Sequence, residues 1–127
     1  MNQRIPTAAR LLLACIRLIN GTVGLFAPQL ILRQLGNDLT RYPAAHYILR
    51  MFGIRTILIA LDLFRTEAPG HEQAVRLAPV IHASDTIVAV LAARAGTLPP
   101  ATVKSIVSIS AINTLLAVLM QPRRLRR

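Results

Sequence analysis

Four apolar stretches, each about 20 residues or longer, dominate the chain and limit what it can fold into. An α-helix rises about 1.5 Å per residue, so about 20 residues cross a hydrocarbon core about 30 Å thick. Short polar or proline-containing segments connect the stretches, as expected for antiparallel neighbours in a bundle. We therefore predict an all-α integral membrane bundle of four transmembrane helices in up-down antiparallel order. The approximate spans are residues 8–32, 44–64, 74–95 and 101–121.

The composition supports a lipid environment. Of the 127 residues, 54% are hydrophobic and 16% are charged, and the mean hydropathy is +0.51. Soluble domains carry about 25% charged residues, and a short soluble chain has proportionally more surface to cover with polar groups. The length allows a single membrane domain, residues 1–127.

The basic residues are placed for a membrane topology rather than for nucleic acid. The net charge is +10, and the one basic cluster, Arg123 to Arg127, directly follows the last apolar stretch. With no Trp, two Tyr and three Phe, the chain offers few side chains on which bases could stack. We expect membrane lipids as partners and no nucleic acid.

The distribution of charge also predicts an orientation. Four spans leave both termini on one side, which would hold eight basic residues against four on the other. The positive-inside rule then favours both termini in the cytoplasm. The eight are Arg4, Arg10, Arg65, Arg76, Arg123, Arg124, Arg126 and Arg127, and the four are Arg33, Arg41, Arg94 and Lys104. We do not expect a cleaved signal peptide, because the first apolar stretch is long and no small-x-small site follows it.

Glycine and proline mark the ends of the predicted helices. Turn chemistry is found at Gly36-Asn37-Asp38, Ala68-Pro69-Gly70 and residues 96–100, and Gln121-Pro122 ends the last helix. Pro79 lies inside the third stretch and predicts a kink there. A kink of this kind is tolerated in a membrane when neighbouring groups satisfy the carbonyl that proline leaves free.

Ionisable and amide side chains inside the spans are the candidates for function. A charge at the bilayer centre costs about 2.5–3.5 kcal/mol on insertion scales, so it tends to face the interior of a bundle. Helical spacing places three pairs of such residues on shared faces, and all six could converge in one polar core. They are Arg17, Asn20, Arg55, Asp62, His82 and Asp85.

Three interpretations of this polar core remain open. In the structural one, Asp62 and Asp85 neutralise Arg17 and Arg55 and hold the helices in register. In the functional one, Asp85 is an acid, His82 titrates, and an arginine anchors an anion. In the third, the arginines lie near the interface and extend toward water without pairing.

Other reactive groups carry little chemistry. Cys15 is the one cysteine, and we expect a small buried side chain rather than a reactive thiol. His46, His71 and His82 show no metal-ligand spacing. The sequence has no glycine-rich phosphate loop and no nucleophile elbow. We predict no metal, no cofactor and no catalytic residue.

Three short motifs resemble the small four-helix, DoxX-like membrane proteins of actinobacteria, a group that includes families known only as domains of unknown function. They are Arg17-Leu-Ile-Asn-Gly-Thr-Val-Gly-Leu-Phe-Ala-Pro28, Arg50-Met-Phe-Gly-Ile-Arg55 and His82-Ala-Ser-Asp85. The resemblance implies a four-helix fold in a bacterial inner membrane. It also implies a role as an accessory subunit of a redox or export system, and it transfers no catalytic residue.

Two functions follow from the sequence. The first is a non-enzymatic accessory or scaffold subunit that binds lipid, another membrane protein or a second copy of itself. It rests on the small size and on the absence of a catalytic constellation in the sequence. The alternative is a small carrier or membrane enzyme that uses the Arg/His/Asp core for a proton or an acidic lipophilic substrate.

Overall fold

The described part of the protein is entirely helical. The computed structural model describes residues 3–37 and 40–122, so Asp38 and the basic cluster Arg123 to Arg127 lie outside the described residues. Five helices follow one another: α1 (Arg4–Phe26), α2 (Pro28–Gln34), α3 (Pro43–Phe64), α4 (His71–Arg94) and α5 (Pro100–Leu119).

Three of these helices, α1, α4 and α5, are long enough and apolar enough to cross a membrane, where we expected four. The exception is α3. It is 22 residues long, but it carries Arg50, Arg55 and Asp62, and a charge near the bilayer centre opposes insertion. A membrane protein with three candidate spans is therefore the coarser description that the structure supports.

The first predicted span is broken at Ala27. We expected one helix over residues 8–32, but α1 ends at Phe26 and α2 begins at Pro28. Proline disfavours helical geometry in the residue before it, and Ala27 has φ −136° and ψ 53°. The N–H of Ala27 still bonds the carbonyl of Val23 at 2.8 Å, so α1 ends on a satisfied turn.

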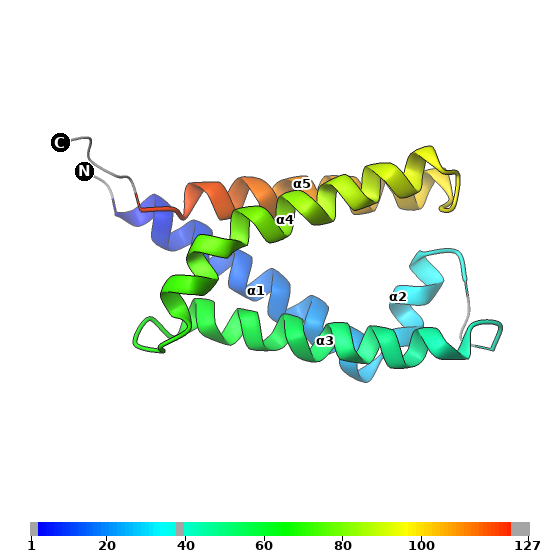
Figure 1. The fold of residues 1–127 in the computed structure, drawn as a ribbon, viewed down its shortest axis with the longest axis horizontal. Helices are drawn as coiled ribbons and strands as arrows, with labels where there is room; N and C mark the ends of the chain where they lie inside the picture. Colours follow the sequence, from blue (N-terminus) through cyan, green and yellow to red (C-terminus); the bar gives the residue numbers. More distant parts are fainter. Residues whose placement is uncertain (1–2, 38–39, 123–127) are drawn as a thin grey trace.

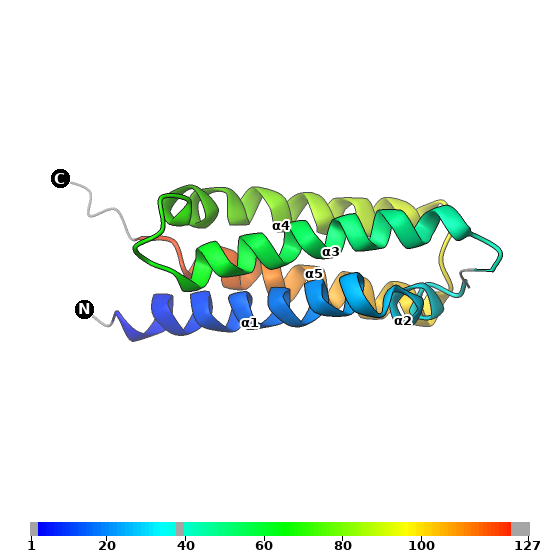
Figure 2. The ribbon, with the colours of Figure 1, turned by 90° about the horizontal axis from the view of Figure 1, so that it is seen from below.

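The four long helices form two antiparallel pairs. Figures 1 and 2 show α1 beside α3 and α4 beside α5, with the first and last described residues at the same end of the molecule. The α1–α3 pair is close because glycines meet at the crossing. A Cβ on Gly53 would lie 2.5 Å from the backbone nitrogen of Leu25 and 2.7 Å from the carbonyl oxygen of Gly21, so larger residues would separate the helices.

The two pairs pack against each other at the end that holds the termini. A core of small and aliphatic side chains from α1, α3, α4 and α5 fills this end, and Arg10 donates a hydrogen bond to the carbonyl of Leu63. The buried members of the core are Ala9, Leu13, Ala14, Leu63, Ala78, Ala117 and Met120.

At the opposite end, α2 connects the pairs. Thr102 at the start of α5 donates a hydrogen bond to the carbonyl of Gln34 at 2.6 Å. Gly36 follows with φ +77°, the left-handed geometry that glycine adopts easily, and a Cβ there would lie 2.8 Å from Pro99. The turn expected at Gly36 and Asn37 is therefore present.

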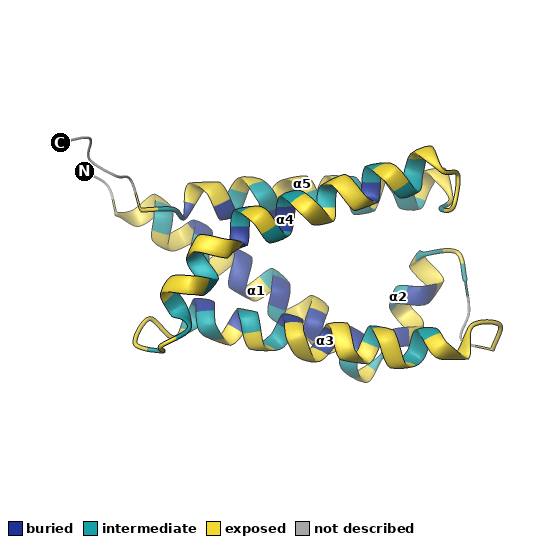
Figure 3. Ribbon diagram, in the orientation of Figure 1, coloured by how far each residue is buried: buried dark blue, intermediate teal, exposed yellow. Residues whose placement is uncertain are grey.

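Figure 3 shows exposed residues along every helix, and many of them are large and apolar. They include Ile19, Tyr47, Val80 and Val118. Soluble monomers rarely expose large apolar surface, so this many exposed apolar side chains suit a lipid environment. Cys15 belongs to this surface, because it is exposed on α1. Our expectation that it is buried was wrong, since the buried face of α1 runs through Leu13, Arg17 and Gly21.

Pro79 lies inside α4, which continues as one helix but changes direction in its first half (Figure 1). Proline has no N–H to offer the carbonyl four residues earlier, which is that of Val75. The side-chain amide of Gln121 supplies the missing donor at 2.7 Å and also bonds the carbonyl of Ala117 at 2.9 Å. A polar side chain just beyond α5 thus completes the backbone hydrogen bonding of the kinked helix.

We expect Gln121→Met to lower the free energy of unfolding by about 1–3 kcal/mol, because it leaves the Val75 carbonyl without a donor. The matched background is Pro79→Ala, in which the helix regains its own N–H for that carbonyl. Thermal unfolding in detergent, followed by circular dichroism, measures both. An equal cost of Gln121→Met in the two backgrounds would contradict this assignment.

Candidate functional site

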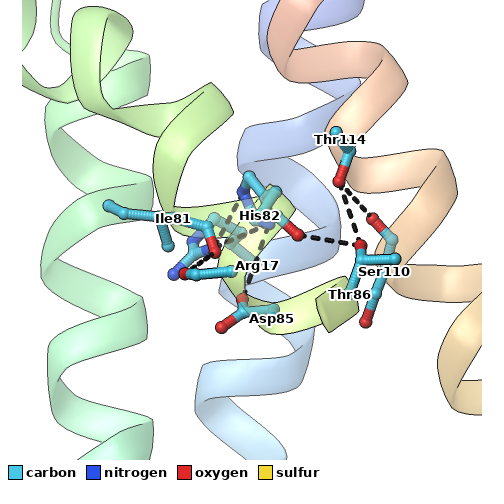
Figure 4. A network of polar contacts seen from close by, with 8 residues as sticks. Arg17, Ile81, His82, Asp85, Thr86, Ser110 and Thr114 are labelled. Carbon is cyan, nitrogen blue, oxygen red and sulfur yellow. Dashed lines mark hydrogen bonds and ion pairs between the residues drawn. The ribbon is translucent and has the colours of Figure 1, made fainter. Parts of the chain in front are cut away.

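Arg17 and His82 form the central polar contact between the two helix pairs. Arg17 lies on the inner face of α1 and is 6% exposed, and His82 lies on the inner face of α4 and is 2% exposed. Nη1 of Arg17 is 2.8 Å from Nε2 of His82 and 3.3 Å from Nδ1. Figure 4 shows the guanidinium reaching the imidazole from α1.

The chemistry of the two side chains assigns the proton on the imidazole. A guanidinium only donates hydrogen bonds, so Nε2 of His82, the closer nitrogen, accepts through its lone pair. The ring is therefore neutral, with its proton on Nδ1. That nitrogen lies 3.8 Å from Oδ2 of Asp85, one turn further along α4. The three residues form a chain that runs Arg17 to His82 to Asp85.

Asp85 differs from its two neighbours in exposure. Its side chain is 52% exposed, whereas that of His82 is 2% exposed. At 3.8 Å its carboxylate is beyond hydrogen-bond distance of the imidazole. The acid is therefore held near the buried pair while one side of it stays open to other groups.

Hydroxyl groups fix α4 against α5 next to this chain. Thr86 donates to the carbonyl of His82 at 2.9 Å, and its oxygen lies 3.2 Å from that of Thr114 on α5. Thr114 in turn lies 2.8 Å from the carbonyl of Ser110. These contacts, drawn in Figure 4, hold the backbone that carries His82.

A cavity of about 360 Å³ lies beside the polar chain of Arg17, His82 and Asp85, and residues of all four long helices line it. Its polar lining is Arg17, Asn20, Thr56, His82, Asp85, Ser110 and Asn113, and apolar side chains such as Phe52 and Ile106 complete it. Among the described residues, two buried polar side-chain atoms have no hydrogen-bond partner: Nε of Arg17 and Oδ1 of Asn113. Both residues line this cavity, and unpaired buried polar atoms of this kind call for a partner.

A second hollow, about 460 Å³, lies between α4 and α5 and is almost entirely apolar. Thr86 and Thr114 line it, but their hydroxyls already contact each other. Its lining also includes the exposed Arg94, but neither of the two unpartnered buried polar atoms belongs to it. The cavity beside Arg17, called the inner cavity below, is therefore the better candidate site.

The structure brings together four of the six residues expected in the polar core. Arg17, His82 and Asp85 form the chain described above, and Asn20 lines the same cavity. Arg55 is exposed on α3. Asp62 is near the end of α3, where its carboxylate lies close to Gly70 and its carbonyl accepts a 2.8 Å hydrogen bond from His71.

The pairing pattern differs from the simple structural interpretation. Arg76 and Glu72 form an exposed ion pair within α4, and the neutral His82 approaches Asp85 on the same helix at 3.8 Å. Neither joins an arginine of one helix to an aspartate of another. The direct partner of Arg17 is an imidazole.

Three polar residues of the cavity lining were not among the predicted six: Thr56, Ser110 and Asn113. Asn113 is 8% exposed, and Thr56 is also buried. Asn113 is the one amide in the interior of the last apolar stretch, since the other, Gln121, ends that stretch, so its isolation was a usable signal. Threonine is common in transmembrane helices, and nothing in the sequence around Thr56 distinguishes it. No group of three or more metal-ligating side chains is found among the described residues.

Comparisons with protein-family models, curated proteins and solved structures give no match. The resemblance to DoxX-like proteins therefore stays a prediction, and the function must be argued from the site itself.

Proposed function

We propose that this chain is a membrane protein that binds a small acidic lipophilic molecule in the inner cavity, as a carrier or receptor for it. The observation that carries the proposal is the buried guanidinium of Arg17, whose Nε has no partner and whose side chain lines the cavity. A guanidinium with a free N–H is well suited to a carboxylate. Oδ1 of Asn113 would accept a hydrogen bond from the ligand or from water.

The dimensions and lining of the cavity favour a small ligand with an apolar body. About 360 Å³ equals the liquid volume of about twelve water molecules. The apolar side chains of Phe52, Leu98 and Ile109 face this space and would cover the body of the ligand while Arg17 holds its acid group. Sites for small molecules commonly combine such a lining with a few polar anchors.

The same geometry favours binding over catalysis. The cavity holds one imidazole and one carboxylate beside one guanidinium, and its hydroxyls come from Thr56 and Ser110. Among the described residues neither hydroxyl is hydrogen-bonded to the imidazole of His82, whose ring contacts Arg17 and Asp85, so an activated nucleophile is not supported. We therefore describe a binding protein rather than an enzyme.

The proposal includes a topology. We infer that α3 crosses the bilayer beside α1 as a fourth span, because it is of similar length and its glycine crossing holds it against α1. With both described ends on one side (Figure 1), the excess of basic residues favours a cytoplasmic location for them. The membrane would be a bacterial inner membrane.

Ligand binding can be measured with a tryptophan reporter, because the chain contains no Trp. In a Phe52→Trp background, cyclohexanecarboxylate should change the fluorescence in a saturable way. Arg17→Gln should weaken this binding at least about tenfold, which is about 1.4 kcal/mol, because it removes the anchor charge.

The matched control is Arg55→Gln, which removes an exposed arginine outside the cavity and should leave the affinity unchanged. Saturable binding that is equally strong in Arg17→Gln, or the absence of saturable binding in the reporter protein, would contradict the proposal.

One observation favours a second candidate, the accessory subunit. Arg55 is exposed near the middle of α3 and has no ion pair or hydrogen bond within the described residues. A charge at that depth is costly in lipid. A transmembrane helix of another protein that carries an Asp or Glu at the same depth would neutralise it.

We expect a photo-crosslinking amino acid at Leu58, exposed one turn from Arg55, to give one defined adduct in native membranes. Arg55→Leu should remove the adduct, whereas Arg65→Leu beyond the end of α3 should not. An adduct that persists in Arg55→Leu would contradict an interface built on this charge.

A further inference from the structure

The charges that face the inner cavity cancel one another. Arg17 from α1 contributes one positive charge and Asp85 from α4 one negative charge. His82 accepts a hydrogen bond from Arg17 and is therefore neutral. The residues that α3 and α5 contribute, such as Thr56 and Asn113, carry no charge. The ligand-free cavity thus has a net charge of zero.

Entry of an anion would disturb this balance. The ligand carboxylate and Asp85 would then compete for one guanidinium, and the site would hold a net negative charge within the membrane. Two carboxylates that share a site strongly disfavour double ionisation, and an uncompensated charge is costly in an apolar environment. Neutralisation by one proton removes both penalties.

The structure offers a place for that proton. Nδ1 of His82 and Oδ2 of Asp85 are 3.8 Å apart, and the Asp85 side chain is about half exposed. A proton that arrives on the carboxylate turns it from a competitor for Arg17 into a neutral donor. Arg17 is then free to hold the ligand, and the loaded cavity again carries zero net charge.

We propose that binding of one monocarboxylate in the inner cavity is coupled to the uptake of one proton by the His82–Asp85 pair. The inference rests on the proposed function, since it concerns the same cavity. The balance is simple: one anion and one proton enter a neutral site and leave it neutral, with no bond formed or broken other than the bond to the proton.

A pH dependence follows from this stoichiometry. Uptake of a proton on binding makes the complex stronger at lower pH. Wherever the free ligand is ionised and the pair is unprotonated, the dissociation constant should rise about tenfold for each unit of pH. The neutral isostere cyclohexanecarboxamide brings no charge, so its affinity should not change with pH.

The proton can be counted directly on the full-length protein in lipid nanodiscs. Calorimetric titration with cyclohexanecarboxylate in two buffers of different ionisation enthalpy gives the number of protons taken up per ligand. We expect one proton for the carboxylate and none for the carboxamide. A value of zero for the carboxylate, with saturable binding, would overturn the coupling and leave the proposed function intact. No saturable binding would overturn both.

Variants assign the proton to its site. Asp85→Asn removes the competing charge, so the carboxylate should bind with no proton uptake and with little dependence on pH. Asp85→Glu should retain an uptake of one, and so should Asp62→Asn, the matched control at a carboxylate outside the cavity. One proton per ligand in Asp85→Asn would overturn the assignment. The pH dependence of the wild-type protein tests the coupling even if a variant fails to fold.

Discussion

A guanidinium buried between transmembrane helices must find its partners within the protein, and the arrangement of this molecule depends on that requirement. Arg17 projects from α1 and donates to His82 on α4, which joins one helix pair to the other. The bond also fixes the imidazole as neutral and turns its N–H toward Asp85. One contact therefore sets the tautomer, the charge and the direction of the whole polar chain.

The fold protects this contact by closing the two pairs at both ends. Small and aliphatic residues such as Leu13 and Ala117 pack at the end with the termini. At the other end, α2 reaches α5 through the hydrogen bond between Thr102 and Gln34. The cavity lies between these closures, so Arg17 has unpaired hydrogen-bonding capacity in a space that the fold keeps open.

The sequence predicted the all-helical architecture and the membrane environment, because both follow from the length and composition of the apolar stretches. It also selected Arg17, His82 and Asp85, because charge inside an apolar stretch is an unmistakable signal. The prediction failed where the rotation of a helix about its own axis decides which side chains are buried. Arg55 is as unusual in sequence as Arg17, but it is exposed on α3, and sequence alone does not give the face that a neighbouring helix covers.

The central claim is the direction of the hydrogen bond between Arg17 and His82. Nitrogen NMR of histidine-labelled protein in lipid bilayers reports which ring nitrogen of His82 carries the proton, with assignment by variants of His46 and His71. We predict a neutral ring protonated on Nδ1 near neutral pH, with an Nε2 resonance that shifts in Arg17→Leu. A proton on Nε2, or an Nε2 resonance unchanged in Arg17→Leu, would contradict it.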